Sequence, residues 1–191
     1  EKLSFQGLTF DVGFSDAKIG LRKELVLPHN FATLISRFRV PHAPDMFSID
    51  VDSFDAFLLR AALASTVQGR LFRPRVIVVE SNDNFGDDSF LSFPGDVEVD
   101  EFQPQYHELC GWTCVFKDPR DNFGSKRAMC GAGTRALTHV AGKAGYFLVY
   151  LNSINMFFLR EDVTPELMKQ EWTFQHVMRH SVTLGREKFR F

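Results

Sequence analysis

Two apolar runs of the sequence end in acidic residues, and these acids are the clearest candidates for chemistry. Asp50 and Asp52 close the first run, Glu80 closes the second, and Asn82 follows it by two positions. Neighbouring carboxylates can transfer protons or hold a polar substrate. Carboxylates at strand ends also accept hydrogen bonds from backbone amides and cap helices, so a structural role is the alternative.

Metal-binding patterns are weaker. His107, Cys110, Cys114 and Cys130 are residues of ligating type, but the H-x2-C-x3-C spacing lacks the paired C-x2-C geometry typical of structural zinc. If the stretch 80–88 is aligned with a calcium-binding loop so that Glu80 is the first ligand, Gly86 falls at the seventh position. Calcium loops need a glycine at the sixth position for their sharp turn. We therefore expect no metal site, and three thiols that pack as small apolar groups.

The apolar spacing around the acids predicts a strand, a helix and a second strand. Residues 46–51 form a compact apolar run that is typical of a buried parallel strand. Residues 53–62 continue at helical spacing, with Ser53 as the N-cap. The β-branched run 75–80 predicts a second buried strand. This order predicts a right-handed βαβ unit.

The N-terminal part of the sequence carries fewer signals. Residues 8–13 predict a short strand and turn. Residues 31–38 have apolar side chains at helical spacing, and Asn30 stands at the N-cap position. Together with the elements that follow, residues 1–163 are predicted to form one α/β domain.

The second half of the chain predicts an insertion followed by regular elements. Residues 82–125 are rich in Asn, Asp, Gly and Pro, and such a long irregular connection is usually functional, partner-binding or disordered. Small and apolar residues over 129–141 predict a third helix. Residues 146–151 and 155–160 are predicted to form two strands. The three residues between them are too few for a parallel crossover, so the strands should form an antiparallel hairpin. A Thr-Pro-Glu start predicts a final helix and basic tail over 164–191.

Four sequence blocks in this order resemble FkbM-type methyltransferase-like proteins. "PDMFSIDVDSFDAFLLRAAL" followed by "RPRVIVVESNDNF" is similar to that family's run S-I-D-I-D-G-x-D-Y and then R-P-R-V-V-x-I-E-Y-N. "CGAGTRALTHVAGKAGYFLV" and "NMFFLRED" resemble its later blocks. The similarity covers roughly residues 18–162. Ser53 and Ala56 stand where the family has Gly and Tyr.

The resemblance implies the C-terminal part of a Rossmann-like methyltransferase fold: α/β, with a mostly parallel sheet, a C-terminal antiparallel hairpin and flanking helices. It places Asp50 and Asp52 at the end of the fourth strand, and Glu80 and Asn82 at the end of the fifth. Ligands of open α/β sheets bind outside the carboxyl ends of the strands. These four residues are therefore the candidate catalytic residues.

The same family binds S-adenosylmethionine mainly through its first two strands, with a Gly-rich turn and an acid. The candidate turn here is Asp11-Val12-Gly13, followed by Gly20, and it lacks a close cluster of glycines. We interpret it as an ordinary turn, so that Asp11 and Gly13 are cofactor-binding candidates only under the alternative. The cofactor-binding half is predicted to be missing from this chain.

Charge and composition restrict partners and location. A formal net charge of −2 over 191 residues gives no general attraction for nucleic acid, although the basic segment 175–191 is suited to an acidic partner. No apolar run reaches the length of a membrane span. Three cysteines favour a reducing compartment, so we expect an intracellular protein, with the mitochondrion or another organelle as options.

Three hypotheses for function follow. The first is a non-catalytic methyltransferase-like domain that acts as an accessory or structural subunit of a larger protein assembly and binds no cofactor. The 21 phenylalanines suit it, because Phe makes dry contacts inside or between subunits. The second is an active S-adenosylmethionine-dependent methyltransferase whose cofactor strands lie outside this chain. The third is a small-molecule or metal-binding module.

Overall fold

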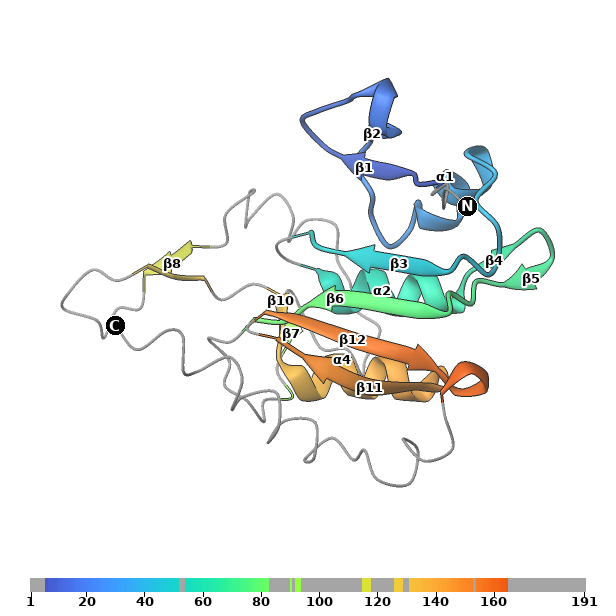
Figure 1. Ribbon diagram of the computed structural model, residues 1–191. Helices are drawn as coiled ribbons and strands as arrows, with labels where there is room; N and C mark the ends of the chain where they lie inside the picture. The colour runs from blue at the N-terminus through green and yellow to red at the C-terminus, as the bar shows by residue number, and fades with distance from the viewer. Residues whose placement is uncertain are drawn as a thin grey trace.

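A four-stranded sheet is the centre of the protein in the computed structural model (Figure 1). The structure describes residues 6–51, 54–82, 90, 92–93, 115–117, 126–128, 131–152 and 154–164. The strands lie in the spatial order β11-β12-β6-β3. Their bounds are Met46–Ile49 for β3, Val76–Glu80 for β6, Tyr146–Leu151 for β11 and Asn155–Arg160 for β12.

The strand directions make this a mixed sheet. β3 and β6 are parallel, whereas β12 is antiparallel both to β6 and to β11. Three strands therefore run in one direction, and β12 lies between two of them in the opposite direction. The predicted α/β class and the predicted C-terminal antiparallel hairpin are confirmed. Its link is closed by Asn152, whose Oδ1 accepts hydrogen bonds from the backbone N–H groups of Ile154 and Asn155.

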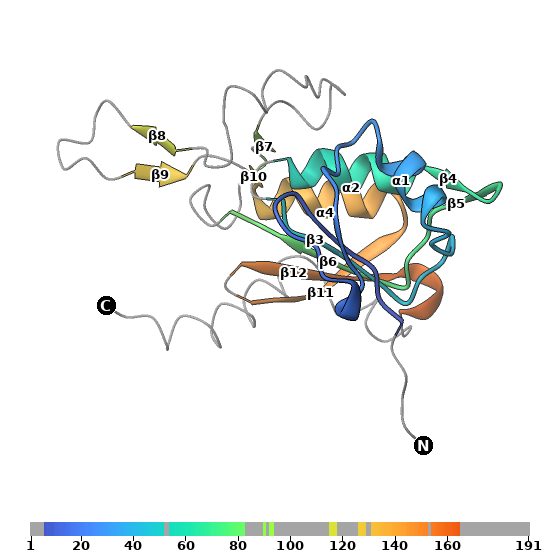
Figure 2. The ribbon, with the colours of Figure 1, turned by 90° about the horizontal axis from the view of Figure 1, so that it is seen from above.

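Helix α2 (Asp55–Ala64) connects β3 to β6 and packs on the sheet, as predicted, but its N-cap position is one residue later than expected, at Phe54 instead of Ser53. Its buried surface is wider than the predicted stripe, because Leu59 and Leu63 are buried together with Phe57 and Leu58. Figure 2 shows α1, α2 and α4 on the same face of the sheet. Between α2 and β6 the chain also forms a small hairpin, β4 (Thr66–Val67) and β5 (Arg70–Leu71).

Helix α1 (Phe31–Arg37) is confirmed, and Asn30 is its N-cap residue as predicted, but the side chain of Asn30 does not cap the helix. Asn30 makes no side-chain hydrogen bond into the helix. Its Oδ1 accepts from the backbone N–H of Leu27, and its Nδ2 donates to the carbonyl of Leu25, each at 2.8 Å. The reason is that an Asn side chain can also stabilise the turn before a helix.

Three aromatic rings join α1, the sheet and the loop before β6. Phe31, Phe47 and Phe72 contact one another with ring centroids 5.2–5.4 Å apart, in tilted and edge-on geometry. Phe31 and Phe72 are fully buried. Such a cluster combines a large buried area with favourable ring electrostatics, so the phenylalanine content contributes to the core of the chain itself.

The third helix begins later than the spacing predicted. α4 spans Thr134–Lys143, whereas Gly131–Ala132 form the short strand β10, which pairs with β7 (Ser92–Phe93). Gly131 has φ +87°, which is outside the helical region. The helical prediction is therefore wrong over 131–133, because a glycine with positive φ and a strand pairing replace the first turn, and its part over 129–130 lies outside the described residues.

Smaller elements complete the described chain. At the N-terminus, β1 (Thr9–Asp11) and β2 (Leu21–Lys23) form a parallel pair with the 3₁₀ turn η1 (Ala17–Ile19) between them. Within the predicted insertion lies β8 (Val115–Lys117), which pairs with β9 (Lys126–Ala128) directly after the insertion. Another 3₁₀ turn, η3 (Glu161–Val163), follows β12. The predicted final helix and basic tail lie outside the described residues from position 165 onward.

None of the described helices is long and apolar enough to cross a membrane.

Candidate functional site

The carboxyl ends of β3 and β6 meet at one edge of the sheet, which we call the carboxyl edge. Ile49 and Val79 are the last residues that β3 and β6 pair with each other, and Asp50 and Glu80 directly follow them. The two strands lie side by side in Figure 1, so the backbone brings two of the predicted acids to the same edge. Asp50 is exposed and Glu80 is half-buried. Asp52 lies outside the described residues.

A third carboxylate is buried behind this edge. Asp55 is 2% exposed and lies in the first turn of α2, where the helix dipole favours a negative charge. Its Oδ1 accepts a hydrogen bond of 3.0 Å from the backbone N–H of Val51, the second residue after β3. The carboxylate thus fixes the turn that leads from β3 into α2.

The residues after β6 are also tied to the rest of the chain. Ser81 is 1% exposed, and both its backbone N–H and its hydroxyl donate to the carbonyl of Ile154, at 2.6 and 3.1 Å. The backbone N–H of Asn82 donates to the carbonyl of Ala132 in β10, at 3.0 Å. These bonds connect the end of β6 with two later parts of the sequence.

Gly131 lies close to Asn82, which follows β6, and to Asp55, at the start of α2. A Cβ atom added to it would lie 3.6 Å from Cβ of Asn82 and 3.8 Å from Oδ2 of Asp55, so there is room for it. The positive φ is what requires glycine here. The sequence pattern assigned this glycine to a helix, and the resemblance noted Ser81 only as the residue that replaces the family's Tyr, without a role. A glycine just before a helix was the available signal for a turn.

The candidate cofactor turn has the geometry of an ordinary turn. Asp11 ends β1, and its Oδ1 accepts hydrogen bonds from the backbone N–H groups of Gly13 and Phe14, at 2.7 and 2.8 Å. This is a local side-chain turn of the kind that Asp commonly makes. β1 pairs with β2 and does not belong to the four-stranded sheet.

The residues considered for metal binding can be placed only in part. His107, Cys110, Cys114 and Cys130 all lie outside the described residues, as does most of the stretch 80–88 considered for calcium. Among the residues that the structure does describe, no group of three ligating side chains is close enough to hold a metal ion. The prediction of no metal site therefore stays a prediction.

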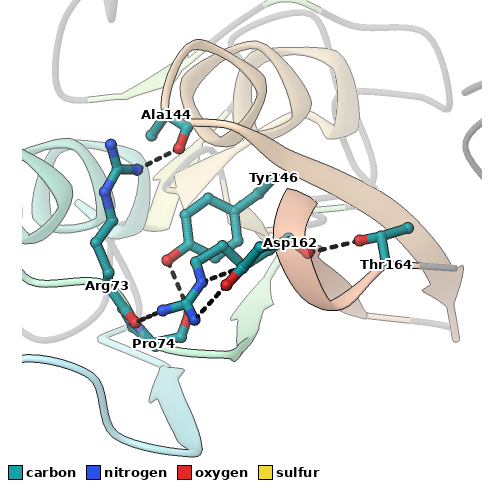
Figure 3. Close-up of polar contacts among 7 residues, drawn as sticks. Arg73, Pro74, Ala144, Tyr146, Asp162 and Thr164 are labelled. Carbon is teal, nitrogen blue, oxygen red and sulfur yellow. Dashed lines mark hydrogen bonds and ion pairs between the residues drawn. The ribbon is translucent and has the colours of Figure 1, made fainter. Parts of the chain in front are cut away.

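The opposite edge of the sheet, the amino edge, holds a polar network (Figure 3). The hydroxyl of Tyr146 donates to the carbonyl of Pro74 at 2.8 Å. Arg160 binds both carboxylate oxygens of Asp162, at 2.5 and 2.9 Å, and donates to the carbonyl of Arg73. The network joins the segment before β6 to the start of β11 and the end of β12.

Burial and neighbouring charges shift the pKa values of two groups in this network, Tyr146 and Asp162. Burial raises the pKa of the Tyr146 hydroxyl to about 12, against the opposing effect of the Arg73 and Arg160 charges. The hydrogen bond from Arg160 lowers the pKa of the Asp162 carboxyl below its ordinary value. Sequence reasoning did not single out these residues, because their partners are far away along the chain.

The chemistry of the carboxyl edge is limited to what its side chains offer. Asp50 and Glu80 can accept hydrogen bonds or a proton, whereas Asp55 and Ser81 hold the backbone. Comparison of the chain with protein-family models, with curated proteins and with solved structures gave no match.

Proposed function

We propose that this chain is a methyltransferase-like domain without catalytic activity, which serves as an accessory subunit of a larger protein assembly. The observation that carries the proposal is the use of polar groups at the carboxyl edge and in the candidate cofactor turn. At the edge, Asp55 accepts from the backbone of Val51 and Ser81 donates to the carbonyl of Ile154, and in the candidate cofactor turn Asp11 accepts from its own turn. Each of these hydrogen bonds stabilises the fold, and none of them requires a substrate.

The arrangement of strands supports the methyltransferase-like part of the proposal. The resemblance implies two parallel strands followed by an antiparallel pair at the C-terminus. β3 and β6 are parallel, and β11 and β12 form the antiparallel pair. The acids that the resemblance assigns to strand ends, Asp50 and Glu80, directly follow or end these strands.

The edge strand β3 supports the subunit part. In the described chain β3 is at the end of the sheet and pairs with β6 alone. Met46 in this strand is 64% exposed, although the sequence predicted a strand buried on both faces. The open edge of a strand offers backbone N–H and C=O groups for pairing, and in proteins such edges are normally covered. A neighbouring chain in an assembly would cover it.

An active methyltransferase is the second candidate, and one observation favours it. Asp50 is exposed, and it lies beside Glu80 at the edge where ligands of such sheets bind. Under this alternative the cofactor is S-adenosylmethionine, and Asp50 contributes to the site.

Calorimetry with S-adenosylmethionine and S-adenosylhomocysteine separates the two candidates when it is done on the protein as isolated from the cells that make it, because the alternative places the cofactor strands outside the 191-residue chain. The proposal predicts no heat of binding for this protein, and the same result for its Asp50→Asn variant. Micromolar binding that Asp50→Asn weakens would overturn the proposal in favour of the enzyme. A heat that Asp50→Asn leaves unchanged would also overturn it, because the chain would then bind the cofactor elsewhere.

A separate measurement, the size of the native complex, tests whether the protein is a subunit of an assembly. In an extract of the cells that make the protein, the proposal predicts elution by size-exclusion chromatography as a complex much larger than the chain alone. Elution at the size of a single chain, at native concentration and low salt, would contradict the role as a subunit.

A further inference from the structure

Exposed apolar side chains are concentrated near the N-terminus. The structure describes nine exposed large apolar residues, and four of them fall within the 17 residues from 9 to 25. Phe14 and Ile19 are the most exposed of all, at 73% and 67%, and Val12 and Leu25 are each 37% exposed. We call residues 9–25 with 37–39 the N-terminal surface. Figure 1 places β1 and β2 beyond β3, on the side away from β11.

The turns that carry these side chains are held in place by local bonds. Phe14 follows the turn closed by Asp11, and its own backbone N–H donates to that carboxylate. Ile19 ends η1 and precedes Gly20, which has φ +72°. If Gly20 carried a Cβ atom, that atom would lie 2.7 Å from the carbonyl oxygen of Gly7. Only glycine fits there. The exposed apolar groups are therefore presented by defined turns.

Basic side chains surround the same turns. The N-terminal surface has five Lys and Arg residues and three carboxylates. Asp11 and Asp16 accept hydrogen bonds from backbone amides of their own turns, and Glu24 pairs with Arg37. Among the described residues, no ion pair engages the remaining four cations, which are Lys18, Arg22, Lys23 and Arg39.

Pairing and ring contacts bring the two parts of this surface together. Arg22 is the register partner of Phe10 in the β1–β2 pair. The ring of Phe10 lies 5.3 Å from the ring of Phe38, which follows α1 and precedes Arg39. The cations of β2 and those at the end of α1 are thus on neighbouring elements.

We propose that the N-terminal surface docks on an anionic lipid membrane, with Phe14 and Ile19 inserted at the level of the head groups. Exposed apolar residues flanked by Lys and Arg are the combination that binds peripheral proteins to such membranes. Single-stranded nucleic acid fits less well, because its bases stack on aromatic rings and gain little from Ile19, Val12 and Leu25. The inference does not depend on the proposed function.

Cosedimentation with lipid vesicles tests this directly. The full chain is expected to pellet with vesicles that contain phosphatidylserine, to pellet much less with pure phosphatidylcholine, and to be released by salt. The Phe14→Ser/Ile19→Ser variant should bind at least about tenfold more weakly, because both apolar contacts are lost. The Lys18→Ala/Arg22→Ala/Lys23→Ala variant should lose about fivefold for each cation removed.

Two control variants assign the binding to this surface. Leu71→Ser/Ile154→Ser removes two comparably large exposed apolar residues elsewhere and should bind as the parent does. Neutralising Arg186, Lys188 and Arg190 in the basic C-terminal segment should leave most of the binding intact. The proposal is overturned if the parent chain does not pellet, if Phe14→Ser/Ile19→Ser pellets like the parent, or if only the C-terminal variant loses binding. Binding to single-stranded DNA in place of vesicles would equally overturn it.

Discussion

The two edges of the sheet use polar residues in different ways. At the amino edge, Tyr146 and Arg160 are bonded to backbone carbonyls that lie 72 and 87 residues away in the sequence. At the carboxyl edge, the Asp55 carboxylate accepts a hydrogen bond from Val51, four residues back, and Ser81 bonds to Ile154, 73 residues away. Both edges therefore hold distant segments together. They differ in their exposed acids: Asp162 at the amino edge is paired with Arg160, whereas no ion pair among the described residues engages Asp50 at the carboxyl edge, so a ligand could contact Asp50 there.

The largest effect is expected for Asp55→Ala. The substitution removes the carboxylate that accepts from the half-buried N–H of Val51 and a favourable charge from the first turn of α2, where Asp55 itself is buried. We expect the free energy of unfolding to fall by about 2–3 kcal/mol, measured by urea denaturation.

The matched control for that prediction is Asp50→Ala at the same edge. Asp50 is exposed, so its loss should change the free energy of unfolding by less than about 0.5 kcal/mol. If the two substitutions had equal effects, the distinction between a structural and an exposed acid would be wrong.

A smaller effect is expected for Tyr146→Phe at the amino edge. The ring stays in place, but the carbonyl of Pro74 loses its donor in a buried position. The cost should be about 1–2 kcal/mol, measured as a lower urea midpoint. Tyr150→Phe is the comparison, because that side chain is 43% exposed and should tolerate the change. Equal stability of the two variants would show that the Tyr146 hydrogen bond contributes nothing.

Gly131→Ala tests whether backbone conformation matters at the carboxyl edge. There is room for the methyl group, so the expected cost of about 1 kcal/mol comes from the positive φ alone. Gly142→Ala, inside α4 and with nothing within 4 Å, should instead stabilise the protein by up to about 1 kcal/mol. Thermal unfolding of both variants measures the difference, and a stabilising Gly131→Ala would contradict the assigned turn.

The smallest effect concerns alkaline pH. Burial raises the pKa of Tyr146 from 10.0 to about 12, so the folded protein retains this proton when the unfolded chain has lost it. The resulting stability is complete below pH 10 and is lost as the pH rises towards 12. The difference in urea midpoint between the parent and Tyr146→Phe should therefore shrink over that interval. A constant difference would mean that the hydroxyl does not titrate as assigned.

Local patterns predicted those elements whose side chains meet only their neighbours. The hairpin of β11 and β12 was predicted at its observed bounds, because alternating burial and a short link leave few alternatives. The predicted acids Asp50 and Glu80 were correctly expected at the same edge, because parallel strands share it. The start of α4 was misplaced, since nothing near Gly131 indicates that β7, almost 40 residues earlier, will pair with β10.

The sequence by itself determined the α/β class, the strand–helix–strand unit and the position of the acids after the strands. Apolar periodicity is enough for these, because it fixes which face of each element is buried. Only the tertiary structure decided that Asp55 and Ser81 act as ties and that Tyr146 joins distant segments. It also decided that Phe14 and Ile19 are exposed. These properties depend on contacts between residues far apart in the chain, which no local pattern encodes.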